Sequence, residues 1–189
     1  MDNILSWISN FLNLPRSNLV SPLPQSGLQA RNIKPIQSMP SAGDFQKGFA
    51  NYGQNVPIAT ASAQLAQGAQ SLPSTIDPYL AAVIAIMESQ GGLKQVGVNN
   101  PFNLRGLQNN RTQFINYPDL TTAILGGNNQ GVQSKGFYGQ ILQNPSYEPF
   151  RKSGDLADFF KVYTPPGPEY GNPSLEDLLG RYSSIRQKF

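Results

Sequence analysis

One carboxylate in this chain lies where acid–base chemistry would need it. Glu88 ends an apolar segment that starts near Asp77, and Ser89-Gln90-Gly91-Gly92 follows it. A glutamate near the carboxyl end of a helix faces the negative end of the helix dipole, which disfavours its charge. It is also in line with Leu80 and Ile84 at four-residue spacing, so it points toward the apolar side. Both effects favour the protonated form and raise the pKa of Glu88, as a general acid requires.

The other carboxylates after position 75 have simpler explanations. Five of them precede a predicted helix or lie in its first turn, where they cap the helix or oppose its dipole: Asp77, Asp119, Asp155, Glu176 and Asp177. Three more are expected to be solvated: Glu148, Asp158 and Glu169. Glu88 is the one placed against local preference, which often marks function. The alternative is a glutamate that reaches solvent where its helix ends.

The segment after Glu88 carries groups that suit a sugar. Gly91 and Gly92 can end the helix in a left-handed turn and let a ligand approach the backbone. Asn99-Asn100-Pro101-Phe102-Asn103-Leu104-Arg105 then offers amides, an aromatic ring and a cation. Amides bind sugar hydroxyls, and aromatic rings bind the apolar faces of sugars. The alternative is a capped turn, with Phe102 and Leu104 in the core.

The composition excludes several kinds of catalysis. The chain contains no His and no Cys, which removes Ser-His-Asp and Cys-His sites, His-ligated zinc and disulfides. Acid–base chemistry must therefore come from Asp, Glu, Tyr or Lys. The net charge is +3, from 14 basic and 11 acidic residues, and no Lys/Arg cluster concentrates it. We expect no nucleic-acid binding, and no metal or cofactor is implied.

Residues 75–189 are predicted to form a compact, mainly helical domain of the α+β class. The expected helices are each marked by a capping residue or an apolar pattern, and they follow Asp77, Asp119, Asp155 and Ser174 or lie around Phe137–Leu142. Residues 107–118 alternate in an extended pattern that predicts a short β-hairpin or an irregular strand. Five or so helices with a small β element make up this class of fold.

The first 74 residues have a different character. Residues 1–14 repeat apolar side chains at helical spacing and predict a short amphipathic helix, too short to span a bilayer and without the features of a cleaved signal peptide. We expect it to dock on its own domain or on a sister protein, with membrane contact as the alternative. Residues 15–74 are rich in Pro, Ser and Gln, and they cannot build a core of their own. They predict an arm or linker that a partner surface orders.

Three segments following this arm resemble a known family. Met87–Gly92, Asn100–Gly106 and Phe114–Ile124 resemble the lysozyme-like superfamily, closest to bacterial and phage glucosaminidases and lytic transglycosylases. Those proteins show E-S-x-x-G at a helix end, then N-L-F-G-I-K or N-P-x-N-[IL]-R, then an aromatic-rich segment that leads into a helix with an A-[IL] pair. Tyr163-Thr164-Pro165-Pro166 is similar to the Y-A-P-P element of some phage members. The order and spacing of the four elements give the resemblance its weight, and it covers about residues 75–189.

The resemblance implies a helical lysozyme-like fold with a cleft, and cleavage of the β-1,4 bonds between the amino sugars of peptidoglycan. Glu88 falls on the family's general acid, and Asn103 and Arg105 fall on the element that lines the cleft. The aromatic candidates for sugar stacking or for the cleft wall are Phe102, Tyr117, Phe137, Tyr138 and Tyr163.

One departure concerns the glutamate element itself. The usual E-S-x-[WFY]-G has an aromatic or small residue where this chain has Gln90-Gly91. A second carboxylate is also not evident, although retaining and inverting hydrolases generally use two. A single glutamate suits a lytic transglycosylase, in which the substrate's own hydroxyl attacks to give an anhydro product, or substrate-assisted hydrolysis. Asp119 and Glu148 remain candidates for a distant second acid.

The leading hypothesis is a peptidoglycan-cleaving domain carried by a phage virion, as a tail or ejection component that opens the cell wall during genome delivery. Glu88 would protonate the glycosidic oxygen and then act as a base. Residues 1–74 would bind other virion subunits, and the site of action would be the bacterial cell wall or periplasm. The alternative is a structural or adaptor subunit of the virion that keeps the lysozyme-like fold without turnover.

Overall fold

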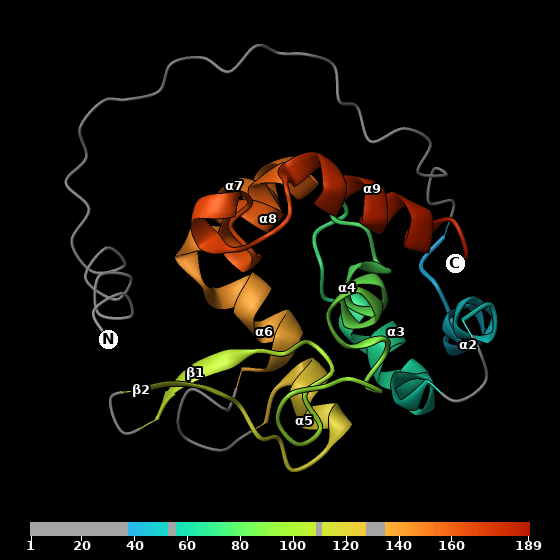
Figure 1. The fold of residues 1–189 in the computed structure, drawn as a ribbon. Coiled ribbons are helices and arrows are strands. Elements are labelled where there is room, and N and C mark those ends of the chain that lie inside the picture. The colour runs from blue at the N-terminus through green and yellow to red at the C-terminus, as the bar shows by residue number, and fades with distance from the viewer. Residues whose placement is uncertain (1–37, 53–55, 109–110, 128–134) are drawn as a thin grey trace.

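The fold is mainly helical with one small sheet (Figure 1). The computed structural model describes residues 38–52, 56–108, 111–127 and 135–189. Within these residues the sheet has two antiparallel strands, which confirms the predicted α+β class with mostly helical content. The helix expected at residues 1–14 and the first part of the expected arm lie outside the described residues.

The described elements are α2 (Ala42–Ala50), η1 (Pro57–Ala61), α3 (Ser62–Ala69), α4 (Leu80–Ser89), β1 (Arg105–Gln108), β2 (Arg111–Phe114), α5 (Leu120–Leu125), α6 (Gly136–Gln143), η3 (Pro145–Tyr147), α7 (Glu148–Ser153), α8 (Leu156–Tyr163), η4 (Pro168–Tyr170) and α9 (Leu175–Arg186). The longest loop between neighbouring elements whose residues are all described runs from α4 to β1. Within the described part of the chain, no helix has the length and apolar character needed to cross a membrane.

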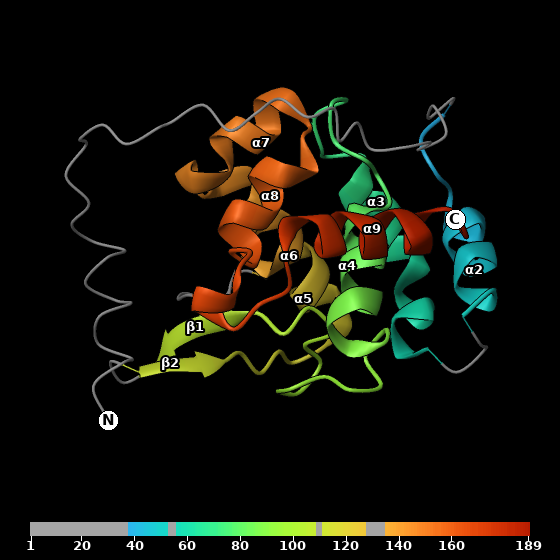
Figure 2. The ribbon, with the colours of Figure 1, turned by 45° about the horizontal axis from the view of Figure 1, so that its top comes forward.

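Helix α4 is the central element of the molecule. Its residues from Leu80 to Ala85 are fully buried, because the helix is apolar on every side and therefore needs neighbours all around. Helix α9 packs across it and α3 lies beside it in both ribbon views (Figure 2). Only the last turn of α4 carries a charged residue, Glu88, so the glutamate lies where this buried helix emerges from the core.

A hairpin is present, as one of the two expectations for residues 107–118 had it, but its strands run from Arg105 to Gln108 and from Arg111 to Phe114, so it begins and ends earlier than predicted. Strand β1 pairs with β2 in antiparallel register, with Arg105 opposite Phe114 and Gln108 opposite Arg111. The guanidinium of Arg105 lies 4.4 Å from the centre of the Phe114 ring, a cation–π contact that holds this side chain along the sheet. Figures 1 and 2 place the hairpin and the α4–β1 loop on the same lower side of the molecule.

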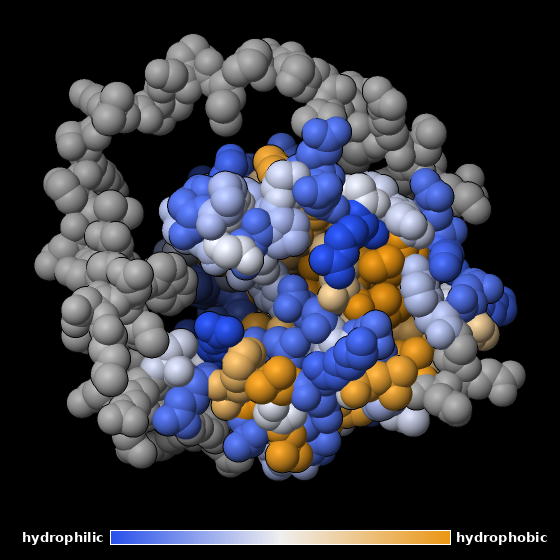
Figure 3. All heavy atoms as spheres, in the orientation of Figure 1, coloured by the Kyte–Doolittle hydropathy of each residue, from blue (hydrophilic) through white to orange (hydrophobic). Residues whose placement is uncertain are grey.

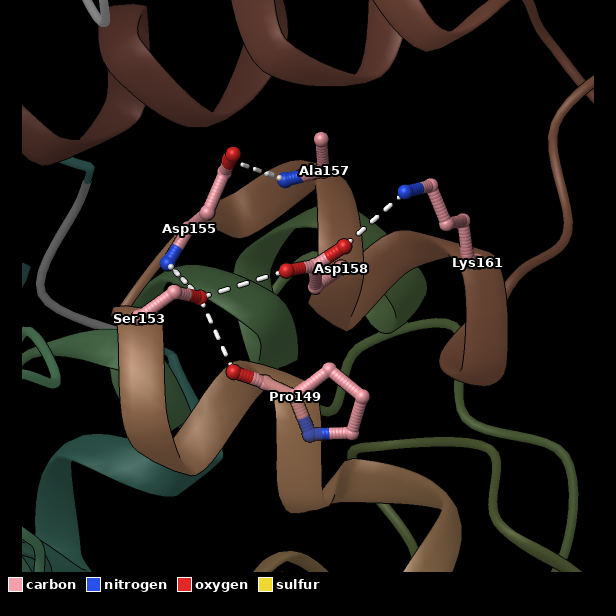
Figure 4. Close-up of polar contacts among 6 residues, drawn as sticks. All are labelled: Pro149, Ser153, Asp155, Ala157, Asp158 and Lys161. Atoms are coloured by element: carbon pink, nitrogen blue, oxygen red, sulfur yellow. Dashed lines mark hydrogen bonds and ion pairs between the residues drawn. The ribbon is translucent and has the colours of Figure 1, made fainter. Parts of the chain in front are cut away.

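Three of the predicted helix caps are confirmed. The carboxylate of Asp119 accepts from Thr122 N at 2.7 Å, that of Asp155 accepts from Ala157 N at 2.8 Å, and Ser174 Oγ accepts from Asp177 N at 3.1 Å. Figure 4 shows the Asp155 cap at the corner between α7 and α8. Each cap satisfies a backbone N–H group that the first turn of a helix leaves free.

Asp77 does more than the predicted cap. Helix α4 begins at Leu80, and Asp77 Oδ1 accepts from Tyr79 N in the turn before it. Its other carboxylate oxygen accepts from Arg186 Nε at 2.6 Å and from the Tyr182 hydroxyl at 2.9 Å, both on α9. This buried ion pair ties the start of α4 to the far end of α9.

The prediction of an arm at residues 15–74 is wrong for residues 38–52 and 56–74. These form α2, η1 and α3, and Phe45, Phe49, Ile58 and Leu65 are fully buried in the main core. The prediction judged the segment by its own composition, which supplies few apolar anchors. The surface that orders these anchors belongs to the same chain, because Phe49 packs edge-on against Phe189, with ring centres 5.2 Å apart.

Candidate functional site

Glu88 lies half-buried in the last turn of α4. Burial raises the pKa of its carboxyl, and the positive charges of Arg181 and Arg105 lower it, with burial the largest effect. The direction agrees with the sequence argument. Among the described residues, no donor makes a hydrogen bond to this carboxylate and no cation lies within 4.0 Å of it. The environment of Glu88 therefore favours its protonated form, and its oxygens have no partner among the described residues.

The backbone turns sharply directly after Glu88. Gln90, Gly91 and Gly92 have φ values of 53°, 72° and 99°, so the left-handed end predicted for this helix is present and begins one residue earlier, at Gln90. Gly91 has no alternative residue type, because a Cβ there would overlap the side chain of Val56. The turn sends the chain back past the end of α4.

Two side chains fix the returning loop to the end of α4. Ser89 Oγ donates to Pro101 O at 2.6 Å and accepts from Gly92 N at 2.7 Å, and Ser89 is buried. Asn103 Nδ2 donates to Glu88 O at 2.9 Å, while Asn103 Oδ1 accepts from Val96 N at 2.8 Å. The Glu88 carbonyl and the Ser89 side chain are thus held by hydrogen bonds, which fix the backbone from which the Glu88 carboxylate projects.

A third side chain, the amide of Asn100, links the loop to the hairpin. Asn100 is fully buried, and its Nδ2 donates to Leu104 O at 2.8 Å and to Ile115 O at 2.9 Å. Its Oδ1 accepts from Leu104 N at 2.9 Å, so the amide is fully used inside the protein. Asn100 and Ser89 were not predicted as site residues. Their buried hydrogen bonds are the structural reason for the spacing between the Glu88 segment and the Asn100 segment.

Three aromatic residues predicted to bind sugar are instead part of the core. Phe102, Tyr117 and Tyr138 are each at most 2% exposed, and so is Phe137, the fourth candidate. Phe102 stacks on Phe137 with ring centres 4.5 Å apart, and the Tyr138 hydroxyl donates to Leu65 O at 3.1 Å. The prediction treated aromatic rings near the glutamate as surface groups, but these rings supply the bulk that fills the space beneath the loop.

Tyr163 lies near the glutamate, and Tyr117 lies near Tyr163. The half-buried Tyr163 donates its hydroxyl to Phe102 O at 2.6 Å. Burial raises the pKa of Tyr163 well above its usual range, and the neighbouring Glu88 charge adds to this effect. Burial raises the pKa of Tyr117 to about 12, and its hydroxyl has no hydrogen-bond partner among the described residues. Both hydroxyls therefore remain neutral.

Two arginines approach Glu88 from different elements. Arg105, predicted as a binding residue, is exposed at the start of β1. Arg181 on α9 is also exposed and donates from its guanidinium to Met87 O at 3.1 Å, beside the glutamate. Sequence reasoning missed Arg181, because it follows Glu88 by more than 90 positions and only the packing of α9 on α4 brings them together. After proton transfer, both cations would stabilise the resulting carboxylate.

The other described carboxylates are engaged or fully exposed. Glu148, proposed as a distant second acid, pairs with Lys152 at 2.6 Å, and Asp119, the other proposal, caps α5. Asp158 accepts from Lys161 Nζ and from Ser153 Oγ, as Figure 4 shows. Within the described ranges, no three Asp, Glu, His or Cys side chains gather closely enough to hold a metal ion. Glu88 is the one described carboxylate that is not exposed and has no partner.

Comparison of the chain with protein-family models, with curated proteins and with solved structures finds no match. The geometry of the site is therefore the direct evidence for its chemistry. That geometry provides a single proton donor with a raised pKa and two nearby guanidinium groups. The loop after Glu88 is fixed to the end of α4 by hydrogen bonds.

Proposed function

We propose that this chain cleaves the glycan strands of peptidoglycan, with Glu88 as the general acid of a lysozyme-like domain. The observation that carries the proposal is the half-buried Glu88 carboxyl, which lacks a partner among the described residues and has a raised pKa. A raised pKa favours the protonated form, which can donate its proton to a glycosidic oxygen. The resemblance of residues 87–124 to glucosaminidases and lytic transglycosylases supplies the substrate class.

The single-acid arrangement favours a mechanism without a second protein carboxylate. Glu88 would protonate the leaving oxygen, and the resulting carboxylate, stabilised by Arg105 and Arg181, would then take a proton from the attacking hydroxyl. In a lytic transglycosylase that hydroxyl belongs to the substrate itself, and the product carries an anhydro end. Glu148 and Asp119 are not needed in this scheme, because each already has a structural partner.

The test uses the full chain and purified cell-wall sacculi. Wild-type protein is expected to release soluble muropeptides, and Glu88→Gln is expected to lower the rate about 10²–10⁴-fold, the usual contribution of a general acid. Glu169→Gln, at an exposed glutamate, is the matched control and should leave the rate unchanged. Mass spectrometry of the products would distinguish anhydro ends from reducing ends. Equal release by Glu88→Gln would remove Glu88 from the mechanism.

A second candidate is a virion adaptor that keeps the fold without turnover. It is favoured by the use of the Asn103 amide and the Tyr163 hydroxyl inside the protein, which leaves fewer polar groups for a sugar. The same sacculi separate the two functions. Wild-type protein that sediments with the sacculi, but releases nothing at any pH between 4 and 9, would support the adaptor.

A further inference from the structure

The loop between α4 and β1 exposes several aliphatic side chains. Leu93, Val96 and Val98 are 59%, 47% and 59% exposed, and among the described residues only Met39 and Tyr170 are comparable large apolar groups. A single exposed apolar residue is ordinary, but three within six positions form a patch that indicates an interaction surface. Figure 3 shows hydrophobic residues gathered on the lower part of this face, where the loop runs in Figure 1.

The loop backbone is held in place, so these side chains cannot turn inward. Three of its N–H groups donate to internal acceptors at 2.8 Å each: Lys94 to Ser89 O, Val96 to Asn103 Oδ1 and Val98 to Asn116 Oδ1. The carbonyl of Val98 also accepts from Tyr117 N at 2.9 Å. A backbone satisfied in this way keeps its present course, and the apolar side chains point outward as a consequence.

Every charged residue of the loop and hairpin segment that carries the patch, between Glu88 and Asp119, is positive. Residues 89–118 contain no Asp or Glu, and they contain the cations Lys94, Arg105 and Arg111. Lys94 lies between the apolar residues and is exposed, as is Arg105. The lower side of the molecule, formed by the loop and the hairpin, therefore combines protruding aliphatic groups with positive charge.

This combination suits a lipid surface better than a protein. Protein interfaces concentrate their binding energy in Trp, Tyr and Arg seated in pockets, whereas Leu and Val are under-represented there. Aliphatic side chains beside lysine and arginine fit the boundary of an anionic bilayer, with the chains among acyl groups and the cations at the headgroups. We infer that the α4–β1 loop binds anionic membranes, inserting Leu93, Val96 and Val98 while Lys94 and Arg105 contact lipid phosphates. This inference does not depend on the proposed cleavage of peptidoglycan.

The first experiment measures insertion directly. The chain has no cysteine, so Val96→Cys in the full chain can be labelled with an environment-sensitive dye at one site. Vesicles with phosphatidylglycerol are expected to shift the emission to the blue and to increase it several-fold, and vesicles of phosphatidylcholine alone are not. Met39→Cys, at an equally exposed apolar position, is the matched control and should not respond. No shift at position 96, or an equal shift at position 39, would overturn the inference.

The second experiment measures binding by sedimentation with the same vesicles. Leu93→Ser/Val96→Ser/Val98→Ser is expected to bind at least tenfold more weakly than wild type, and Lys94→Gln about fivefold more weakly at low salt. Met39→Ser and Lys47→Gln are the matched controls, since both positions are exposed elsewhere. Wild-type affinity in the triple variant would place any membrane contact elsewhere in the chain, such as residues 1–14, and would overturn the inference.

Discussion

The protonation of Glu88 depends on burial, which raises its pKa, and on two arginines, which lower it. We expect Arg181→Gln to raise this pKa further, because it removes a positive charge that stabilises the carboxylate. A general acid acts while protonated, so the alkaline limb of the pH–rate profile should move to higher pH. Arg181→Lys keeps the charge and is the control. The measurement is the rate of muropeptide release from sacculi between pH 4 and 9, and an unmoved limb in Arg181→Gln would contradict the prediction.

Glu88 is also expected to cost stability at neutral pH. Its pKa in the folded chain is raised above the ordinary value of 4.5, so the folded state holds this proton over a range of pH where the unfolded state has released it. Stability therefore falls as the pH rises from about the ordinary value to the raised one, and stays lowered above it. Glu88→Gln cannot ionise and should exceed wild type in stability more at pH 8 than at pH 4. Urea unfolding at both pH values checks this, with Glu169→Gln, which should show no such difference, as the control.

At the scale of elements, the site depends on how the loop is fastened to α4. Ser89→Ala would leave Pro101 O without its buried donor and Gly92 N with only its longer bond to Ser89 O at 3.2 Å, at a cost of about 1–3 kcal/mol in the free energy of unfolding. Ser71→Ala removes one local hydrogen bond at an exposed position and should cost about 0.5 kcal/mol or less. Chemical denaturation measures both. If Ser89→Ala also slows muropeptide release, the fastening positions Glu88, and an unchanged rate would limit Ser89 to stability.

The elements that the sequence predicts best are those with local causes. The caps at Asp119, Asp155 and Ser174 need only a side chain and the first turn of its own helix, and the hairpin needs only its alternation. The raised pKa of Glu88 was predictable for the same reason, because its position on an apolar helix already implies burial. The local pattern also predicted the turn after Glu88, although the turn begins at Gln90 and not at Gly91.

Features that depend on distant contacts could not be predicted in this way. Whether Tyr138 faces a sugar or fills the core is decided by α3, since its hydroxyl donates to Leu65 O, 73 positions earlier. The approach of Arg181 to Glu88 requires α9 to pack across α4. In both cases the sequence shows the residue type, but the packing of another element decides what the residue does.

At the scale of the whole molecule, residues 38–52 and 56–74 belong to the folded unit. A fragment of residues 74–189 would lack Phe45, Phe49, Ile58 and Leu65, all buried in the main core. We expect it to lose cooperative thermal unfolding, followed by near-ultraviolet circular dichroism, while residues 38–189 retain it. Cooperative melting of the shorter fragment would contradict this.

A point substitution tests the same dependence without truncation. Phe45→Ala in the full chain should lower the free energy of unfolding by about 3–5 kcal/mol, because it leaves a cavity in the core. Gln46→Ala, at the next and exposed position of α2, should change it by about 0.5 kcal/mol or less. Equal effects of the two substitutions would indicate that α2 is only a loosely attached arm that contributes little to stability.

The contact between α2 and the C-terminal residues Lys188 and Phe189 also affects the order in which contacts form during synthesis. Asn51 Nδ2 donates to Lys188 O, 137 positions later, and Phe49 packs against Phe189. At a ribosomal rate of about 5–20 residues per second, α2 waits roughly 7–27 s before these partners are translated. The contacts of α2 with α3 can form early, because α3 follows closely in the chain, whereas the part of α2 that meets Phe189 stays uncovered until the end of this interval.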